Sequence, residues 1–417
     1  MNATVERVDV LIVGGGPAGL AAARELRANG AGKVVVLDRE PEAGGIPRHC
    51  GHYPFGMREL KRVLRGPDYA RRLADRADAA GAEIRPSTSV TKLHAGGTVD
   101  IATGNGLASI QADRVLLATG VRESSRAARL IGGTKPGGIM STGALQGLVY
   151  LQKMRPFERP VILGSELVAF SALLTCRHAG IRPVAMIEPH ATATARWPVA
   201  ALARIMGVPL LLRHRVGAIR GTRRVSNVEV IDAGGTTHVL ATDGVVVSGE
   251  FLPESSLVRE SSLEFDGRTG GPAVDPWFRC SDPAFFAAGN LLRPVETAGW
   301  SWNEGRRAGR LIARSLEGGL PDPEPASRLR LTGDILKYAM PQRLPELTRS
   351  FDGLRMNALQ LRVVRPVVGN LVMRAGGRIV YSRPLRSRPE RRILLPLADI
   401  ALDGYPVVEV TVEECVA

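Results

Sequence analysis

The sequence contains few cysteines, and their spacing excludes several kinds of redox and metal centre. The four cysteines, Cys50, Cys176, Cys280 and Cys415, stand far apart in the chain. Neither a CxxC nor a CxxxxC redox pair is present, and no cluster has the spacing of a zinc or iron–sulfur site. We therefore expect no disulfide-reductase dithiol, no metal site and no iron–sulfur module on this chain.

Long hydrophobic runs and lysines are also scarce. No apolar run approaches the roughly 18 residues that span a bilayer, and an apolar strand predicted from Val8 onward leaves no room for a signal peptide. We therefore expect a cytoplasmic protein without a transmembrane segment. The net charge of +14 comes mostly from arginines. It favours an acidic partner, an anionic substrate or a membrane surface, or it reflects an arginine-rich genome. Because no nucleic-acid-binding motif accompanies the charge, we expect no nucleic-acid partner.

A glycine-rich turn near the N-terminus is the most informative feature that is present. The segment Val8–Val13 is predicted to form a strand and Leu20–Ala28 a helix, with spaced glycines between them. Gly14 permits a tight turn, Gly16 lets a pyrophosphate approach the backbone, and Gly19 lets helix and strand pack closely. Because a helix N-terminus attracts anions, this pattern predicts a dinucleotide site. Its predicted ligands in the turn are Gly14, Gly16, Pro17, Ala18 and Gly19.

An acidic residue supports the same site. Lys33–Leu37 is predicted to form a second buried strand, and Asp38 follows it about 20 residues after the last glycine, as dinucleotide-binding folds require. The carboxylate of Asp38 would accept hydrogen bonds from ribose hydroxyls. It would also repel a 2′-phosphate, although the adjacent Arg39 weakens that exclusion.

Two later segments indicate which dinucleotide binds. Asp113–Gly120 is an apolar strand that ends in a turn of small residues, and Asp282–Asn290 precedes a predicted helix over Gly305–Leu316. From about residue 8 to residue 320, this order of motifs resembles the pyridine nucleotide–disulfide oxidoreductase superfamily of flavoproteins. The resemblance implies that FAD is the cofactor and that the last helix points its N-terminus at the flavin. The further FAD contacts that it implies are Gly45, Ala118, Thr119, Gly120, Gly289, Asn290, Gly299 and Trp300.

Two of these positions leave alternatives open. Asn290 stands where the superfamily usually has an acid that bonds the ribityl chain, and an amide can still donate and accept hydrogen bonds there. Trp300 and Trp302 precede the last predicted helix. They either wall the flavin ring or are core or interface aromatics.

The second dinucleotide turn that the resemblance implies is altered in sequence. It follows the predicted strand Arg159–Leu163, and Glu166 replaces its second glycine. A side chain there blocks a pyrophosphate, and a carboxylate repels it. Ala169 in the third position is tolerable, and Glu188, after the predicted strand Val184–Ile187, could face a ribose. Either this domain has lost NAD(P)H binding, or the turn shifts slightly and NADH binds weakly. We favour the loss, because one substitution adds a steric and an electrostatic cost.

The loop Gly44–Gly56 carries the candidate catalytic residues. His49, Cys50 and His52 lie within four positions of one another. Histidine exchanges protons near neutral pH, and a cysteine beside histidines can have a lowered pKa. Either these side chains transfer protons near the flavin, or they belong to a structural loop whose histidines bond the backbone or a partner chain.

The same loop, together with Gly66–Ala70 and Pro136–Gln146, narrows the resemblance. It is similar to the flavoprotein subunits of opine dehydrogenase, hydrogen cyanide synthase and glycerol-3-phosphate-dehydrogenase-associated complexes. The resemblance implies that such a flavoprotein relays electrons from a small-molecule substrate. Its implied partner is a second flavoprotein subunit, with or without a small iron–sulfur protein.

The composition changes after the proline cluster Pro321–Pro325. Short apolar strands separated by turn signals are predicted from Leu359 to Val412, and they suggest a small antiparallel sandwich or sheet. This region is either a docking or oligomerisation module or an inert structural appendage.

The sequence therefore predicts an α/β fold with two Rossmann-like dinucleotide-binding domains, the second inserted in the first, and a small C-terminal β-rich domain. The predicted FAD domain covers residues 1–135 and 275–322, the degenerate second domain 136–274, and the docking domain 323–417. The predicted function is an FAD-dependent oxidoreductase, one subunit of a multi-subunit dehydrogenase that acts on a small amine, imino acid or hydroxy compound. The alternatives are a stand-alone NAD(P)H-dependent flavin reductase for a ferredoxin-like partner and a non-catalytic flavin-bound scaffold.

Overall fold

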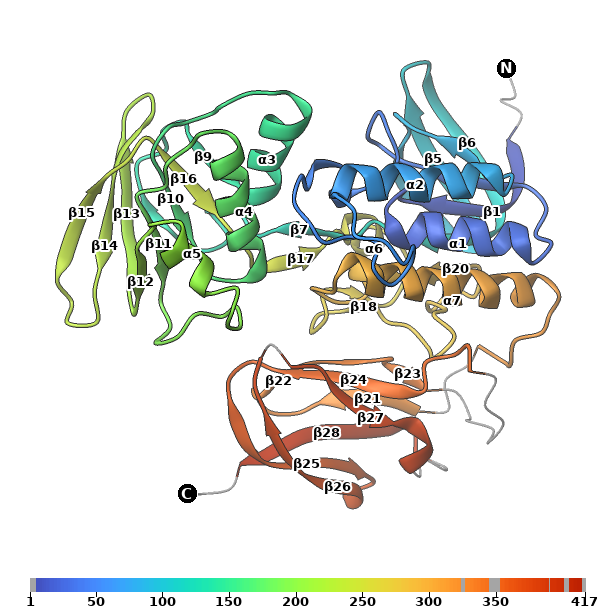
Figure 1. Cartoon of the computed structure of the whole chain (residues 1–417). Coiled ribbons are helices and arrows are strands. Elements are labelled where there is room, and N and C mark those ends of the chain that lie inside the picture. The colour runs from blue at the N-terminus through green and yellow to red at the C-terminus, as the bar shows by residue number, and fades with distance from the viewer. Residues whose placement is uncertain (1–4, 324–326, 345–352, 390, 401–404, 415–417) are drawn as a thin grey trace. The chain divides into compact units, whose positions relative to one another are not determined.

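The computed structural model describes residues 5–323, 327–344, 353–389, 391–400 and 405–414 (Figure 1). The chain divides into two compact units. Unit one holds Met1–Gly45, Ala70–Val121 and Pro253–Ala417, and unit two holds Ile46–Tyr69 and Arg122–Leu252. The loop with the candidate catalytic residues thus falls in unit two, whereas the sequence analysis assigns it to the first domain. The predicted domain boundaries at 135, 274 and 322 stay predictions.

Unit one is built on a sheet in the order β3-β2-β1-β6-β5-β4, with β20 also paired to β6. Strands β1, β2, β3, β6 and β20 run parallel, and β4 and β5 form an antiparallel edge. The predicted strands at Val8–Val13 and Lys33–Leu37 are confirmed, and their runs of buried valine, leucine and isoleucine are typical of a parallel sheet that is covered on both faces. The strands are β1 Glu6–Val13, β2 Val34–Leu37, β3 Glu83–Arg85, β4 Ser89–Leu93, β5 Thr98–Thr103, β6 Gly106–Leu117 and β20 Phe285–Ala287.

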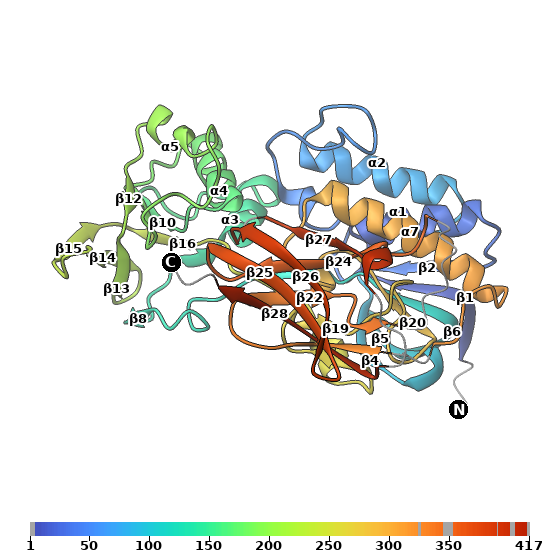
Figure 2. The ribbon, with the colours of Figure 1, turned by 90° about the horizontal axis from the view of Figure 1, so that it is seen from below.

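Two helices of unit one, α1 (Pro17–Ala28) and α7 (Ala298–Leu316), lie side by side (Figures 1 and 2). Glycine makes this close packing possible: a Cβ on Gly305 would stand 2.0 Å from the carbonyl oxygen of Ala18. The sequence predicts a helix only from Gly305, but α7 begins at Ala298. The prediction starts too late because the first turn of α7 contains Gly299, a weak helix former, and the apolar periodicity begins only further along the helix. Helix α2 spans Gly66–Ala79.

Unit two contains a second parallel sheet, in the order β12-β11-β10-β16-β9, and a four-stranded sheet, β15-β14-β13-β8. The succession β10, turn, α4, β11 repeats the succession β1, turn, α1, β2 of unit one, so the predicted pair of Rossmann-like folds is confirmed. The helices are α3 Thr142–Gln146, α4 Leu167–His178 and α5 Ala201–Ile205. The strands are β8 Gly132–Gly133, β9 Ile139–Ser141, β10 Pro160–Leu163, β11 Ala185–Glu188, β12 Leu210–Leu212, β13 Arg215–Gly221, β14 Val225–Ile231, β15 Thr237–Ala241 and β16 Gly244–Val247.

Short elements connect these layers. They are β7 Val121–Glu123, β17 Phe251–Pro253, α6 Ser256–Arg259, β18 Phe265–Asp266 and β19 Gly271–Pro272. Within the part of the chain that the structure describes, no helix has both the length and the hydrophobicity needed to cross a membrane.

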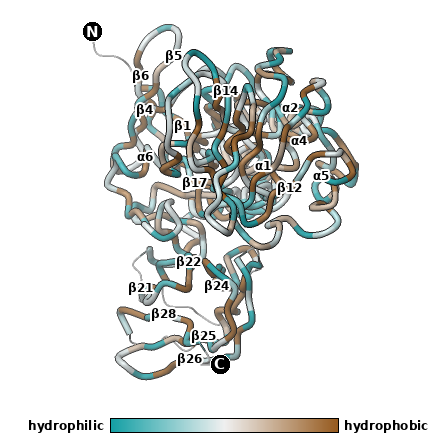
Figure 3. Tube along the Cα trace, turned by 90° about the vertical axis from the view of Figure 1, so that its left-hand side faces the viewer, coloured by the Kyte–Doolittle hydropathy of each residue, from teal (hydrophilic) through white to brown (hydrophobic). Residues whose placement is uncertain are grey.

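The C-terminal region of unit one forms two sheets, β23-β21-β28-β25-β26 and β22-β24-β27. Hydrophobic side chains from both sheets share one core, and the hydrophobic stretches of the strands can be followed in Figure 3. The prediction of a β-rich domain is confirmed, but it is not purely antiparallel, since β21 and β28 run parallel. Strand β21 was not predicted, although its alternation of arginine and leucine is typical of a strand with one buried face. The strands are β21 Ser327–Leu331, β22 Leu336–Met340, β23 Arg343–Leu344, β24 Ala358–Val363, β25 Val367–Ala375, β26 Arg378–Ser387, β27 Ile393–Pro396 and β28 Val407–Glu414.

Candidate functional site

The glycine turn after β1 has the geometry of a phosphate-binding turn. Gly14 has φ +111°, and a Cβ there would stand 2.5 Å from the carbonyl oxygen of Ala118, while a Cβ on Gly19 would stand 2.0 Å from that of Gly14. Position 16 differs, because a Cβ there would meet only the Cα of Gly45, at 3.9 Å. The protein's own packing thus requires Gly14 and Gly19. Gly16 instead keeps the approach to the N-terminus of α1 open, which fits a bound pyrophosphate.

Asp38 lies at the end of β2 and is tied to this turn. Its Oδ2 accepts a hydrogen bond from the amide of Gly15 at 2.9 Å, and its Oδ1 accepts one from the amide of Glu40 at 2.9 Å. The carboxylate is buried, with 8% of the residue exposed. The turn thus holds the carboxylate in place, and its contact with ribose hydroxyls stays a prediction. Arg39 is exposed.

Other predicted contacts surround the start of α1. Pro17 is the first residue of the helix, and the next residue, Ala18, faces Gly289: a Cβ on Gly289, which has φ +77°, would stand 2.9 Å from the Cβ of Ala18. Thr119 donates its hydroxyl hydrogen to the carbonyl of Glu254 at 2.8 Å. At Gly120, which has φ +75°, a Cβ would meet no atom within 4 Å. The structure thus gathers segments that are far apart in sequence around one helix N-terminus.

The side chain of Asn290 forms hydrogen bonds with the loop that follows it. Its Oδ1 accepts a hydrogen bond from the amide of Glu296 at 2.7 Å, and its Nδ2 donates to the carbonyl of the same residue at 3.1 Å. The side chain therefore braces the loop that leads into α7, and its contact with a ribityl chain stays a prediction. Gly299 and Trp300 lie in the first turn of α7. Trp302 packs against Arg306, whose guanidinium carbon is 4.9 Å from the ring centroid.

In unit two, the carboxylate of Glu166 fills the second dinucleotide turn. A Cβ on Gly164 would stand 2.5 Å from Glu166 Oε2, and one on Gly249 would stand 2.3 Å from Oε1. The side chain thus folds back over the turn at the start of α4, where a pyrophosphate would have to lie. Burial, with a smaller contribution from the nearby charge of Glu188, raises the pKa of Glu166 to about 7. Gly249 was not predicted as part of this turn. Its run, Val245–Gly249, nevertheless parallels Leu116–Gly120 of unit one, since both are apolar segments that end in a small residue and a glycine.

Glu188, the acid predicted to face a ribose, is covered by the chain itself. Only 2% of the residue is exposed. Its Oε2 accepts the hydroxyl hydrogen of Ser165, and its Oε1 accepts a hydrogen bond from the amide of His190 at 3.0 Å. Ser165 in turn accepts a hydrogen bond from the amide of Thr194 at 2.9 Å. Residues 190–195 therefore close over the ribose position. No local motif marks these partners, because they follow β11 in an irregular loop.

The three candidate catalytic residues have different neighbours within unit two. The Sγ of Cys50 donates to Oε1 of Gln146 at 3.4 Å, and burial raises the pKa of this thiol to about 12. The possibility of a lowered Cys50 pKa is therefore contradicted, because burial desolvates the thiol and the charge of Glu123 acts in the same direction. The Nδ1 of His52 lies 3.0 Å from the carbonyl oxygen of Tyr53. His49 lies beside α3, where a Cβ on Gly143 would stand 3.6 Å from its Cε1. Their approach to a flavin stays a prediction.

The described cysteines form no disulfide, and the described residues contain no candidate metal centre. Cys176 and Cys280 are buried and free, as is Cys50, and Cys415 lies outside the described residues. Within the described ranges, no three histidine, cysteine, aspartate or glutamate side chains are grouped so that they could hold a metal ion.

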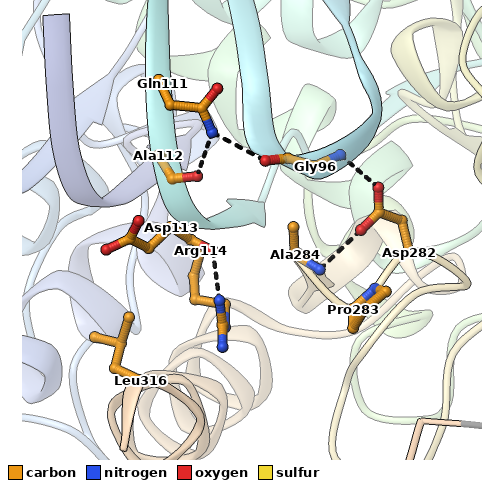
Figure 4. Close-up of a pocket in the computed structure, with 9 residues that line it drawn as sticks. All are labelled: Gly96, Gln111, Ala112, Asp113, Arg114, Asp282, Pro283, Ala284 and Leu316. Atoms are coloured by element: carbon orange, nitrogen blue, oxygen red, sulfur yellow. Dashed lines mark hydrogen bonds between the residues drawn. The ribbon is translucent and has the colours of Figure 1, made fainter.

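A surface pocket in unit one lies away from the glycine turn (Figure 4). Its strand residues pair with β1 before the strand's carboxyl end, Gln111 with Arg7 and Arg114 with Val10. Dinucleotides bind at the carboxyl ends of such strands, so this pocket is at the other end of the sheet. One of its two acids, Asp282, accepts hydrogen bonds from the backbone amides of Gly96 and Ala284. The lining residues are Gly96, Gln111, Ala112, Asp113, Arg114, Asp282, Pro283, Ala284 and Leu316.

The fold and the open glycine turn define a flavoprotein of the two-dinucleotide-domain class. The profile of the pyridine nucleotide-disulphide oxidoreductase family matches residues 8–305. The chain belongs to this family, and it is an FAD-dependent oxidoreductase. The crystal structure of T. acidophilum thioredoxin reductase shares the fold with a TM-score of 0.63 and 24% identity, over 74% of this chain and 99% of that one.

Two curated relatives add detail. The chain is 32% identical to an opine oxidase subunit of Rhizobium meliloti (strain 1021) over 199 residues, which are 47% of this chain and 41% of that protein. It is 28% identical to a ferredoxin--NADP reductase of Saccharopolyspora erythraea over 68% of this chain and 85% of that protein. The chain spans between 41% and 61% of the length of the opine oxidase subunits that it matches.

Proposed function

We propose that this chain is the FAD-containing subunit of a multi-subunit dehydrogenase and relays electrons from the oxidation of a small amine, imino acid or hydroxy compound. One observation carries the proposal: the carboxylate of Glu166 occupies the second dinucleotide turn, over Gly164 and Gly249. The similarity to a protein named as an opine oxidase subunit supports it. The predicted partner is a second flavoprotein subunit, with or without a small iron–sulfur protein. Location in the cytoplasm stays a prediction.

The filled turn argues against NAD(P)H as the electron donor. A phosphate at this turn would have to displace a buried side chain and would face its negative charge whenever Glu166 is ionised. The ribose acid Glu188 already bonds to Ser165 and to the loop that follows β11. Both recognition elements of a pyridine nucleotide are therefore used by the chain itself. Electrons then reach the flavin from a substrate or a partner subunit.

At the first turn, the proposed roles follow from the open geometry. FAD supplies the electron acceptor when it is bound. The amides at the start of α1 would hold its pyrophosphate, since Gly16 leaves that approach clear, and Asp38 would hold the adenosine ribose. The N-terminus of α7 would stabilise negative charge on the reduced ring. His49 and His52 remain the candidates for proton transfer. Cys50 remains a candidate only as a neutral thiol, because of its raised pKa.

Rapid mixing tests the proposal. Under anaerobic conditions, the purified flavoprotein is mixed with NADH or NADPH while the flavin absorbance is followed. We expect no rapid bleaching with either nucleotide, and reduction when the substrate or the partner subunit is added. Purification from the native host should bring down a second flavoprotein. Rapid bleaching by NADH in a lone monomer would contradict the proposal.

A second candidate is a stand-alone NAD(P)H-dependent flavin reductase. The similarity to a ferredoxin--NADP reductase, which extends over 85% of that protein, favours it. It requires that the Glu166 side chain and the loop over Glu188 move aside, and the same mixing experiment distinguishes the two. A non-catalytic scaffold would bind FAD but would be reduced by none of these donors.

A further inference from the structure

The C-terminal domain turns a polar sheet face toward the loop that precedes α7. Alternate residues of β24 are buried in the domain core, so Gln360 and Arg362 lie on the opposite face. A register shift in β22 places Tyr338 opposite Arg362 and Met340 opposite Gln360. The bulge thus adds two more side chains to this face. Met340 Sδ lies 3.9 Å from Nη1 of the fully buried Arg293, which belongs to the loop before α7.

Glu296 is the residue in this loop on which two arginines of the C-terminal domain converge. Arg362 Nη2 donates to its Oε1 at 3.1 Å, and Arg392 Nη2 donates to its Oε2. The side chains of Glu296, Arg362 and Arg392 are only 5%, 17% and 16% exposed. Two guanidinium groups on one carboxylate leave one positive charge in excess, and their burial limits its screening by water and salt.

The neighbouring groups do not cancel this charge. Arg293 forms its own buried ion pair with Glu304, with Nη1 3.2 Å from Oε2, and this pair is balanced. The hydroxyl of Tyr338 is buried and has no hydrogen-bond partner in the described part of the chain. Burial raises its pKa, so it stays neutral. The excess charge on Arg362 and Arg392 therefore remains.

The same glutamate connects the arginines with residues predicted to contact FAD. Its amide and carbonyl bond to the side chain of Asn290 at 2.7 and 3.1 Å. The next residue, Thr297, is the N-cap of α7. Trp300, in the first turn of α7, lies against Arg392, whose guanidinium carbon is 4.5 Å from the ring centroid. The C-terminal arginines thus act at the helix end that the proposed site places beside the flavin.

We propose that the C-terminal domain is part of the flavin site: Arg362 and Arg392 position the loop before α7 through Glu296, and their excess positive charge favours the reduced flavin. This inference rests on the proposed FAD site at α1 and α7. A docking module or an inert appendage would leave the redox potential of the flavin unchanged.

The test is the midpoint potential of the flavin in the full-length protein, measured by reductive titration against a reference dye. In Arg362→Gln and Arg392→Gln, one positive charge is lost. We expect the equilibrium to shift about tenfold toward oxidised flavin, which is about 30 mV for a two-electron couple. In Glu296→Gln the negative charge is lost at nearly constant size, and we expect the potential to rise. A merely structural disturbance of the loop would not give opposite signs.

Arg365→Gln is the matched control. Arg365 lies in the same domain, but its side chain is 47% exposed and pairs with Glu414, with Nη1 2.6 Å from Oε1. We expect this variant to keep the wild-type potential. Potentials that match the control in all variants, or shifts of one sign, would overturn the inference. If an arginine variant does not fold, the sign of the Glu296→Gln shift decides. A wild-type protein that binds no FAD would instead reject the proposed site.

Discussion

Oε1 of Glu166 lies 2.3 Å from the point where a Cβ on Gly249 would stand, so the glutamate side chain fills the space that this glycine leaves open. Oε2 of the same carboxylate does the same at Gly164, at 2.5 Å. The two glycines that would admit a pyrophosphate admit a carboxylate instead. The proposed loss of NAD(P)H binding thus rests on a single residue in the turn, which would add both a steric and an electrostatic cost.

The raised pKa of Glu166 predicts a pH-dependent stability. The carboxyl has a pKa of about 7 in the folded chain against 4.5 for the free side chain. The folded state therefore holds the proton more tightly, and the stability of the protein falls as pH rises from 4.5 to 7, by up to about 3 kcal/mol. Glu166→Gln should remove this loss. Urea unfolding at pH 5 and pH 8 checks it: the advantage of the variant should grow with pH, and a constant difference would contradict the buried carboxyl.

Gly16→Ala should weaken FAD binding without unfolding the protein. Gly16 has φ −79°, which alanine adopts, and its Cβ would meet only Gly45 Cα at 3.9 Å. We expect at least about tenfold weaker FAD binding, because the methyl group stands where the pyrophosphate approaches, and a change in apoprotein stability within about 0.5 kcal/mol. Flavin fluorescence titration measures the affinity. Gly104→Ala is the control, since a Cβ there meets nothing within 4 Å. Equal affinities in the two variants would place the pyrophosphate elsewhere.

Gly305→Ala, unlike Gly16→Ala, should destabilise the fold. A Cβ there would stand 2.0 Å from the carbonyl oxygen of Ala18, so α7 would have to move away from α1. We expect a destabilisation of about 1–3 kcal/mol, as for other overpacked cores, with loss of FAD as a consequence. Thermal unfolding of the apoprotein measures it. Gly267→Ala, at a position without neighbours within 4 Å, should leave the melting temperature unchanged. A normal melting temperature for Gly305→Ala would refute the close helix contact.

The thiol of Cys50 should be unreactive in the native protein. Burial raises its pKa to about 12, so at pH 8 only about one thiol in ten thousand is ionised. We expect iodoacetamide to label Cys50 slowly in the folded chain and quickly after denaturation, and peptide mass spectrometry measures both rates. Buried Cys176, whose pKa is also raised to about 12, is the internal control. Fast labelling of Cys50 alone would restore it as a reactive thiol.

The sequence predicted the parts of the site that depend on local spacing. Gly14, Gly16 and Gly19 stand at fixed distances from β1 and α1, and backbone geometry over a few residues decides what such a turn can bind. The early start of α7 escaped prediction because its first turn contains Gly299, which is a weak helix former. The raised pKa of Cys50 could not be predicted, because it depends on burial in the folded chain and not on the neighbouring histidines in sequence.

The sequence by itself predicted a dinucleotide site after β1 and determined that the second turn carries a glutamate where glycine is usual. Only the tertiary structure decided where that carboxylate lies, how the loop after β11 covers Glu188, and that Arg362 and Arg392 reach Glu296. The physical reason is the separation of the interacting residues along the sequence. The φ and ψ angles of a few consecutive residues set a turn, whereas burial and ion pairs between distant segments exist only once those segments pack together.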